Sequence, residues 1–400
     1  MPNNLSKMNQ LQDFDLKNKK VFIRADLNVP IKSGKITSSQ RIEASLATIK
    51  YCLNEGAKVM VTSHIGRPTE GEYNPEFSLL PVVEFLENHL NKKINLVKDW
   101  TTQSFNVKAG EVIVLENCRF NVGEYNNDEN LAKKYAALAD IFVMDAFGTA
   151  HRKQASTYGI AQFCPKVCAG RLFYSELEAL EKVVKNPKTP MVAIVGGSKV
   201  STKLSILDQL ADKVDQLILG GGIANTFLKA QGFNIGNSLH ENAFIDSAKK
   251  IIQKLESRGA SLPLVTDVIC GKEFNESETA VKKNINDLEP TDMIFDLGPE
   301  TMKGITQNLK QSKTILWNGP IGVFEFDQFS KGTETLAHAI ANSIAFTLAG
   351  GGDTIAALEK FGMINNISYI STAGGAFLEF VEGKKLPAID ILEKRATIEH

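Results

Sequence analysis

The chain is 400 residues long, with 43% hydrophobic and 23% charged residues, an ordinary globular composition with enough apolar material for sizeable cores. This length is expected to form two or three domains. The 45 basic and 46 acidic side chains give a formal net charge of −1, so the chain lacks the concentrated positive charge of a dedicated nucleic-acid or membrane-surface binder.

The cysteines are scattered along the chain, and no two of them form a C-x-x-C pair. They therefore predict neither a disulfide framework nor a zinc site, and the histidines include no H-x-x-x-H pair. The segment from Met1 to Lys20 is polar and has no apolar signal core. No stretch has the ~20 apolar residues of a membrane helix. We expect a soluble, reduced protein of the cytoplasm.

Short β-branched runs alternate with amphipathic segments from Val21 to Thr372. The runs are apolar throughout, which is typical of strands buried on both faces. In the first half of the chain they begin at Val21, Lys58, Glu111 and Asp140. In the second half they begin at Met191, Asp215, Pro263, Asp292, Thr314, Ala345 and Ile367.

Helical patterns lie between these runs. One apolar face, closed by Gly56, consists of Ile42, Leu46, Ile49 and Leu53, and Pro81 stands near the start of the next helix. Strand–helix alternation predicts parallel sheets with helices on both faces, and the runs are too many for one sheet of usual size. We predict an α/β fold of two similar-sized, doubly wound (Rossmann-like) parallel-sheet domains joined by a hinge helix.

The hinge helix is expected at residues 172–187, where Leu177, Leu180 and Val184 form one apolar stripe. This places an N-terminal domain at residues 1–171 and a C-terminal domain at residues 188–387. The segment KLPAID from Lys385 reads as a linker before a last helix, Leu392 to Ile398.

Ligands of open α/β sheets bind beyond the carboxyl ends of the strands, so the residues after each run are candidates for a site. Four arginines of the first half follow strand ends or open helices: Arg41, Arg67, Arg119 and Arg152. Together they favour planar, bidentate recognition of phosphate or carboxylate, whereas any one alone fits a surface or salt-bridging role.

Two further residues at strand ends allow two interpretations each. Asp26 either accepts a hydrogen bond from a substrate hydroxyl or forms an Asx-type turn. His64 is either a ligand-binding or a structural histidine.

Strand ends of the second half carry glycines instead, at residues 196–197, 220–222, 298, 319, 350–352 and 374–375. Glycine lets backbone N–H groups approach a phosphate, and a following helix N-terminus adds its dipole, although tight strand-to-helix turns also use glycine. The segment GGGDT places a carboxylate, Asp353, beside exposed amides. A magnesium ion held by this carboxylate and by nucleotide phosphates fits that arrangement.

Lys199 and Lys203 are four residues apart, and we expect them on one face of a helix, either pointing at phosphates or simply exposed. Glu325 either holds a ribose diol or is an exposed loop residue. The chain contains neither G-x-x-x-x-G-K-[ST] nor G-x-G-x-x-G, so it has no Walker A loop, and a dinucleotide dehydrogenase is disfavoured.

Several long segments, taken together, resemble the phosphoglycerate kinase family. In chain order they are RADLNVP, TSHIGRP, LENCRF, DAFGTAHR, VGGSKVSTKL, LGGGIANTF, DLGPET, LWNGPIGVFEF, AGGGDT and STAGGA. The resemblance runs from about Val21 to the C-terminus, and the chain is similar to bacterial members of the family.

The resemblance implies residue roles. The positions implied to bind 3-phosphoglycerate or 1,3-bisphosphoglycerate are Asp26, Leu27, Asn28, Arg41, His64, Ile65, Gly66, Arg67, Arg119 and Arg152. Those implied to bind ADP or ATP are Lys203, Gly221, Asn318, Glu325, Gly351, Gly352, Asp353 and Thr354, with Asp353 as the Mg²⁺ ligand. Those implied to be catalytic are Arg41, Lys199, Lys203, Gly374 and Gly375. Within these sets, Arg67, Arg119 and Arg152 would hold the phosphate that does not react, and Arg41 would face the transferring group.

The resemblance also implies a monomer whose last helix, about residues 388–400, returns to the N-terminal domain. One position departs from the family, because Ala373 stands where a glycine is usual. Its methyl group fits if the backbone φ at Ala373 is negative.

The implied reaction is 1,3-bisphosphoglycerate + ADP ⇌ 3-phosphoglycerate + ATP. The attacking oxygen is anionic in either direction, so no general base is required, and catalysis is expected from alignment and cations. Anchors on two domains also imply hinge closure about residues 172–187 and 385–388. The alternatives are a nicotinamide dehydrogenase, which lacks its fingerprint, and a two-domain solute-binding protein, which has no need of GGGDT opposite the arginines.

Overall fold

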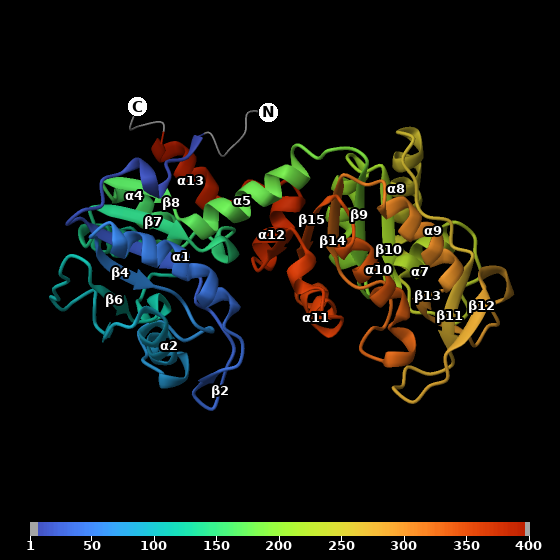
Figure 1. Cartoon of the computed structure of the whole chain (residues 1–400), viewed down its shortest axis with the longest axis horizontal. Coiled ribbons are helices and arrows are strands. Elements are labelled where there is room, and N and C mark those ends of the chain that lie inside the picture. The colour runs from blue at the N-terminus through green and yellow to red at the C-terminus, as the bar shows by residue number, and fades with distance from the viewer. Residues whose placement is uncertain (1–6, 397–400) are drawn as a thin grey trace. The chain divides into compact units, whose positions relative to one another are not determined.

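The computed structural model describes residues 7–396 (Figure 1). The chain divides into two compact units. The first unit runs to Glu178 and resumes at Lys384, and the second comprises Ala179–Gly383. Each unit is built on a parallel sheet with helices packed against it. The predicted α/β class with two Rossmann-like units is confirmed.

The first unit contains a six-stranded parallel sheet with the order β5-β6-β4-β1-β7-β8. Its strands are β1 (Lys20–Ala25), β4 (Lys58–Thr62), β5 (Asn95–Val97), β6 (Val112–Leu115), β7 (Ile141–Asp145) and β8 (Lys166–Ala169). The predicted runs at β1, β4, β6 and β7 are confirmed. Sequence reasoning missed β5 and β8, which are short and form the two edges of the sheet. A small antiparallel hairpin, β2 (Ile31–Lys32) and β3 (Lys35–Ile36), lies outside the sheet.

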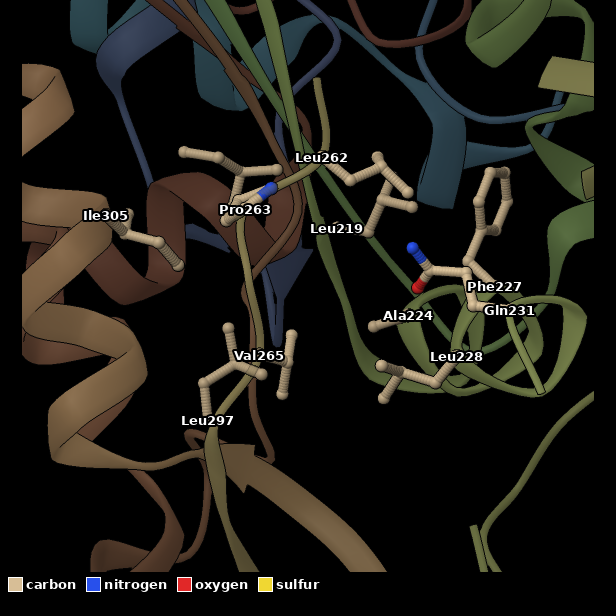
Figure 2. A pocket seen from close by; sticks show the side chains of 11 residues that line it. Leu219, Ala224, Phe227, Leu228, Gln231, Leu262, Pro263, Val265, Leu297 and Ile305 are labelled. Atoms are coloured by element: carbon tan, nitrogen blue, oxygen red, sulfur yellow. The ribbon is translucent and has the colours of Figure 1, made fainter. Parts of the chain in front are cut away.

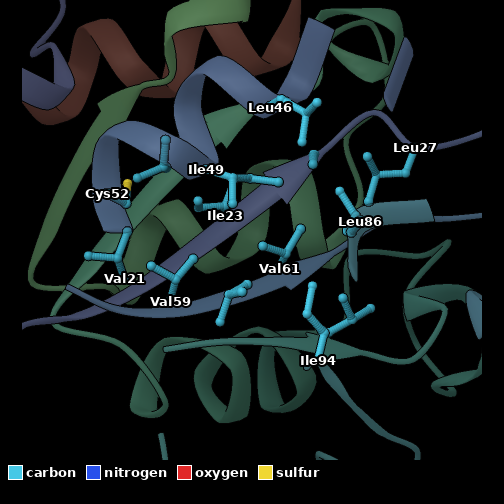
Figure 3. Packing of buried hydrophobic residues seen from close by; sticks show 14 of the residues in the cluster. Val21, Ile23, Leu27, Leu46, Ile49, Cys52, Val59, Val61, Leu86 and Ile94 are labelled. Carbon is cyan, nitrogen blue, oxygen red and sulfur yellow. The ribbon is translucent and has the colours of Figure 1, made fainter. Parts of the chain in front are cut away.

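The helices of the first unit are α1 (Gln40–Asn54), α2 (Leu80–Leu90), α3 (Glu129–Ala137), α4 (Ile160–Phe163) and α13 (Pro387–Ala396), together with the first part of α5 (Arg171–Val184). Helix α1 buries the predicted stripe of Ile42, Leu46 and Ile49. Figure 3 shows Leu46 and Ile49 of this stripe on the side of the sheet that carries the labelled valines and isoleucine of β1 and β4. The apolar period of the sequence therefore places α1 over the centre of the sheet.

Aromatic residues cover the opposite face of the same sheet. The ring of Phe22 lies between those of Trp100, Tyr135 and Phe142, at centroid distances of 5.9, 6.2 and 6.2 Å. Successive side chains of a strand point to opposite faces, so Phe22 faces these rings while its neighbours on β1 face α1. Burial on both faces explains why the strands are largely apolar.

The second unit contains a five-stranded parallel sheet with the order β10-β9-β14-β15-β16. Its strands are β9 (Met191–Gly196), β10 (Gln216–Gly220), β14 (Thr314–Asn318), β15 (Phe346–Gly350) and β16 (Tyr369–Ser371). Its helices are α6 (Leu204–Ala211), α7 (Gly221–Ala230), α8 (Ile245–Ser257), α9 (Pro299–Leu309), α10 (Lys331–Ala341), α11 (Gly352–Lys360) and α12 (Gly375–Val381). The boundary between the two units falls inside α5.

Two predicted strands of the second unit do not belong to its parallel sheet. Strands β11 (Asp267–Gly271) and β13 (Met293–Leu297) join β12 (Val281–Asn284) in a separate antiparallel sheet with the order β12-β11-β13. The parallel assignment was wrong here because β11 is followed by a polar return strand, VKKN, instead of a crossover helix.

Helix α13 begins at Pro387, so the segment predicted as a linker is largely helical, with proline in the first turn, where its missing N–H costs nothing. The helix contacts β8 and α4 (Figure 1). Arg395 donates hydrogen bonds to the carbonyl oxygens of Ala161, Gln162 and Pro165. Ile398, the predicted end of this helix, lies outside the described residues. Within residues 7–396, no helix is long and apolar enough to cross a membrane.

The N-terminus of α9 is held by a carboxylate from another element. Asp267 on β11 accepts hydrogen bonds from the backbone N–H groups of Glu300 (3.1 Å) and Thr301 (2.8 Å). Gly298 makes this approach possible, because a Cβ there would lie 2.3 Å from Cγ of Asp267. Gly304, inside the same helix, faces open space.

Gly298, the N-cap of α9, and Gly304, inside the helix, should therefore respond oppositely to substitution by alanine. Gly304→Ala should raise the free energy of unfolding by about 0.5–1 kcal/mol, because alanine loses less backbone entropy on folding. Gly298→Ala should lower the free energy of unfolding by about 1–3 kcal/mol, because Asp267 or the helix must move. Urea unfolding of both variants beside the parent protein measures the difference. If both variants changed the free energy of unfolding by the same amount in the same direction, the role of Asp267 as the cap of α9 would be wrong.

Candidate functional site

The polar residues predicted for the first half of the chain follow four adjacent strands. Asp26 follows β1, His64 follows β4, Arg119 follows β6 and Arg152 follows β7. These strands are parallel and neighbouring in the order β6-β4-β1-β7, so their carboxyl ends form one edge of the sheet. The chain leaves β1 in the middle of this edge, which is the kind of switch point where open α/β sheets bind ligands.

Arg41, in the first turn of α1, is held by the loop that follows β1. Its Nη1 atom lies 3.5 Å from Oδ1 of Asp26 and donates a hydrogen bond to the carbonyl oxygen of Asn28 (3.2 Å). The side chain of Asn28 accepts a hydrogen bond from the backbone of Gly66 (3.1 Å) and so joins this loop to the one after β4. The Arg41 side chain remains 31% exposed, which leaves its charge accessible to a ligand.

Arg119 is almost entirely buried, at 2% exposure. Its guanidinium donates to the carbonyl oxygen of Gly66 and lies over the ring of Tyr125, 5.1 Å from the centroid. Its buried Nε–H has no hydrogen-bond partner among the described residues. A donor left in this way in a buried place is suited to an acceptor from outside the chain.

Arg67 and Arg152 extend this group of cations. Arg67 is exposed, and Arg152 is half-buried. Burial lowers the pKa of Arg119 and of Arg152, and the positive charge of Arg67 lowers that of Arg152 further. No ion pair between described residues involves Arg67, Arg119 or Arg152. Three neighbouring cations without an ion-pair partner among the described residues make this edge a candidate site for an anion.

Two predicted positions of the first unit have their side chains in the core. Leu27 and Ile65 are 0% and 5% exposed and belong to the apolar cluster under α1. The backbone N–H of Leu27 already donates to Oγ of Ser63 (2.9 Å). These two residues therefore shape the loops that carry their polar neighbours.

In the second unit, the strands of the parallel sheet end at one edge in glycine or a small polar residue, and three helices begin soon after them. Helix α7 begins at Gly221, α11 at Gly352 and α12 at Gly375. The first N–H groups of a helix have no partner inside it and lie at the positive end of its dipole. At α7 two of them are already used, because Gly221 and Ile223 donate to the carbonyl oxygens of Ile321 and Gly197. The starts of α11 and α12 are therefore the candidates for binding phosphate groups.

Lys203 lies at the centre of this edge. Its ammonium group donates to the carbonyl oxygen of Gly196 (2.7 Å) and to Oδ1 of Asn318 (2.6 Å). Burial lowers its pKa to about 8, and the nearby carboxylate of Asp353 acts in the opposite direction. Asn318 also donates to the carbonyl oxygen of Gly350 (2.7 Å), so it connects the loops that follow β9, β14 and β15.

The prediction that Lys199 and Lys203 share a helical face is wrong. Lys199 is exposed, has an extended backbone and precedes a short 3-10 turn, Val200–Thr202. Lys203 then forms the N-cap of α6 with a non-helical backbone. The two lysines lie on either side of a tight turn, so their four-residue spacing is not helical.

The glycines of this edge fall into two groups. A Cβ at Gly319 would lie 2.3 Å from the carbonyl oxygen of Gly196, so this glycine is required by the packing of two loops. A Cβ at Gly352 or Gly374 would meet nothing within 4 Å. The starts of α11 and α12 are therefore open, which leaves room for a ligand at their N–H groups.

Asp353 is exposed in the first turn of α11. The hydroxyl of Thr354 donates to the carbonyl oxygen of Gly350 (3.0 Å) and accepts from the backbone of Gly319 (2.7 Å), so only its backbone N–H remains for a phosphate. Glu325 is exposed. No cluster of three or more metal-binding side chains occurs within residues 7–396. A Mg²⁺ ion at Asp353 would therefore take most of its ligands from phosphates and water.

The methyl group of Ala373 fits only if the backbone φ at this residue is negative, and the structure meets this condition. It is buried at 3% exposure and is not among the described non-glycine residues with positive φ. The left-handed backbone falls instead on Gly374, with φ of 56°. Alanine at position 373 is therefore compatible with the turn before α12.

Sequence reasoning passed over one residue of the first unit. Arg24, on β1, is fully buried and contacts His64. The sequence did contain a signal for this residue, because Arg24 is a charged residue inside an otherwise apolar predicted strand. A charge buried in a strand requires partners.

One small pocket lies outside both groups of residues. Figure 2 shows it between the end of α7 and the segment that precedes β11, lined mainly by leucine and other apolar side chains. Its volume is about 30 Å³, enough for about one water molecule. It is too small for a nucleotide.

Comparison with known proteins agrees with this geometry. The family model of phosphoglycerate kinase matches residues 11–384. The phosphoglycerate kinase of Francisella philomiragia is 57% identical over 388 residues, covering 97% of this chain and 99% of the relative. That of Francisella tularensis is 57% identical over 386 residues, with coverages of 96% and 98%.

Two solved structures are also similar. The phosphoglycerate kinase of Coxiella burnetii has 53% identity and a TM-score of 0.94, and the match covers 97% of this chain and 100% of that one. The phosphoglycerate kinase of Pyrococcus horikoshii has 32% identity and a TM-score of 0.81, with coverages of 98% and 100%. The chain therefore belongs to the phosphoglycerate kinase family.

Proposed function

We propose that this phosphotransferase divides its substrates between the two units. The arginines of the first unit hold 3-phosphoglycerate or 1,3-bisphosphoglycerate, and the helix N-termini of the second unit hold the phosphates of ADP or ATP. The observation that supports this division most directly is the group of Arg67, Arg119 and Arg152, which have no ion-pair partner among the described residues. A nicotinamide dehydrogenase or a solute-binding protein is no longer an alternative, given the family.

The reaction is 1,3-bisphosphoglycerate + ADP ⇌ 3-phosphoglycerate + ATP. Its attacking oxygen is a carboxylate or a diphosphate oxygen, so it needs no general base. The chain has to supply alignment and positive charge around an in-line transfer. On the phosphoglycerate side Arg41 is the candidate for that charge, since Asp26 and Asn28 fix its guanidinium while a third of it stays exposed. On the nucleotide side the candidates are Lys199 and Lys203, with the open N-terminus at Gly374 and Gly375.

The nucleotide is proposed to bind as its Mg²⁺ complex. Asp353 is the proposed protein ligand, with Gly351, Gly352 and the backbone of Thr354 on the phosphates. Bound Mg²⁺ supplies charge neutralisation of the phosphates. Gly221, Asn318 and Lys203 complete the phosphate-binding edge, and Glu325 is proposed to bind the ribose.

Because the two sets of anchors belong to different units, both can act on one phosphoryl group only if the units bring the substrates together. Closure about the hinge segments 172–187 and 385–388 is therefore part of the proposal. A monomer working in the cytoplasm stays a prediction from the family resemblance.

Arg41 and Arg119 should give different kinetic signatures in an assay of 3-phosphoglycerate-dependent ADP formation from Mg-ATP. Arg41→Ala should lower kcat by at least about a hundredfold, because a fixed donor to transferring oxygens is lost. Arg119→Ala should mainly raise KM for 3-phosphoglycerate, because it removes binding that ground and transition states share. Arg41→Lys should recover part of kcat, since the charge stays but the planar fork is lost.

The structure also offers a purely structural role for Arg41 as the residue that ties the β1 loop to α1. If Arg41→Ala lowered only the melting temperature and left kcat near the parent value, the catalytic role would be wrong. Absence of 3-phosphoglycerate-dependent ADP formation in the parent protein would contradict the whole proposal.

Asp353→Asn should weaken binding of Mg-ATP and leave binding of 3-phosphoglycerate unchanged. Asp353 is exposed, so stability should change by no more than about 0.5 kcal/mol. Isothermal calorimetry with each ligand tests this. Metal-free ATP serves as the control, and the variant should bind it at least as tightly as the parent, because a negative charge has been removed. Equal losses for both substrates would show that Asp353 supports the fold instead of the metal.

A further inference from the structure

Arg24 is a charged side chain placed inside the apolar core of the first unit. It lies on the central strand β1 and is 0% exposed. Burying a cation is costly unless it is paired and its N–H groups are satisfied. The partners of Arg24 therefore indicate what its position accomplishes.

The charge of Arg24 is offset through a serine. Its Nε–H donates to Oγ of Ser156 (3.0 Å), and that hydroxyl donates to Oε1 of Glu124 (2.5 Å). Glu124 is also fully buried and accepts a hydrogen bond from the hydroxyl of Tyr135 (3.2 Å). The Nη1 atom of Arg24 donates to the carbonyl oxygen of Ala25 (2.5 Å). These contacts leave the guanidinium little freedom to rotate.

The remaining nitrogen of Arg24 faces the ring of His64. Nη2 of Arg24 lies 3.0 Å from Nδ1 of His64. A guanidinium has only donors, so Nδ1 of His64 must be the acceptor and carries no proton. In a neutral imidazole the single N–H is then on Nε2.

Three further cations act on the same ring. Burial lowers the pKa of His64 well below its usual value, and the charges of Arg24, Arg119, Arg152 and Arg41 lower it further. The ring therefore stays neutral at physiological pH. No hydrogen bond from Nε2 of His64 to another described residue is present, and the side chain keeps 4% exposure.

We propose that Arg24 is a positioning residue, which holds His64 as its Nε2–H tautomer so that the imidazole offers a hydrogen-bond donor to an anionic oxygen of the bound phosphoglycerate. This inference rests on the proposed assignment of the arginine-lined edge to phosphoglycerate. In the other tautomer, the Nε2 lone pair would face the anion and repel it. The buried pair of Arg24 and Glu124 thus determines that the protonated Nε2 of the neutral His64 faces the substrate.

The tautomer can be measured without activity. In the full-length protein labelled with nitrogen-15 histidine, the resonances of His64 are assigned by their loss in His64→Gln. The parent should show a protonated Nε2 and an unprotonated Nδ1, unchanged from mildly acidic to neutral pH. Adding 3-phosphoglycerate should shift Nε2. In Arg24→Met/Glu124→Gln, which removes both buried charges together, the single tautomer should be lost.

The kinetic test is a double-mutant cycle. Loss of a hydrogen bond to a charged group predicts a rise of at least about tenfold in KM for 3-phosphoglycerate in the Arg24→Met/Glu124→Gln protein, with KM for ATP nearly unchanged. In a His64→Ala background the same two substitutions should change that KM much less, because no imidazole remains to be oriented. Arg24→Lys supplies a second variant that keeps the charge, and it should recover part of the KM.

Each contrary result has a distinct meaning. A proton on Nδ1 in the parent, or an unchanged tautomer after removal of Arg24, would overturn the positioning role. The positioning role would also be wrong if the effects of the Arg24/Glu124 and His64 substitutions on KM for 3-phosphoglycerate were fully additive. The expected tautomer with no response of Nε2 to 3-phosphoglycerate would instead contradict the placement of the substrate at this edge.

Discussion

Both units depend on one constraint, the burial of a parallel sheet on both faces. Most side chains of the strands are apolar and buried, and helices or aromatic residues cover each face, as Trp100 and Tyr135 do beside Phe22 of β1. Residues that bind ligands are therefore placed at the carboxyl edge of the sheet, where the chain turns from strand to helix. The arginines of the first unit and the glycines of the second unit lie at such edges.

The carboxyl edges of the two sheets differ in the groups that supply positive charge. In the first unit positive charge comes from side chains that leave the sheet, one of which, Arg41, forms an ion pair with Asp26. In the second unit the proposed sources of positive charge are Lys203 and the backbone N–H groups at helix starts, which can approach a phosphate only where no Cβ intervenes. The open space at Gly352 and Gly374 and the close packing at Gly319 show that neighbouring glycines in one edge serve different purposes.

Much of the fold and the candidate site could be predicted from the sequence because apolar strands and one-sided helices have simple periods. Strand β5 was missed because its residues, NLV, are exposed or half-buried and form no apolar run, and β8, KVCA, begins with an exposed lysine and has one β-branched residue. Strands β11 and β13 were placed in the wrong sheet because an apolar run does not reveal the direction of its neighbour. The residues at strand ends were identifiable by position. The contact of Arg24 with His64 was not, because it joins neighbouring strands and depends on side-chain geometry.

The central claim is that phosphoglycerate and nucleotide are anchored on different units and react only when both are bound. A ligand that touches one unit gives no free energy for bringing the two together, whereas the pair of ligands does. Small-angle X-ray scattering of the free protein, of each binary complex and of the ternary complex measures this directly. The account predicts a smaller radius of gyration only with both ligands present, and an unchanged radius in the ternary complex would contradict it.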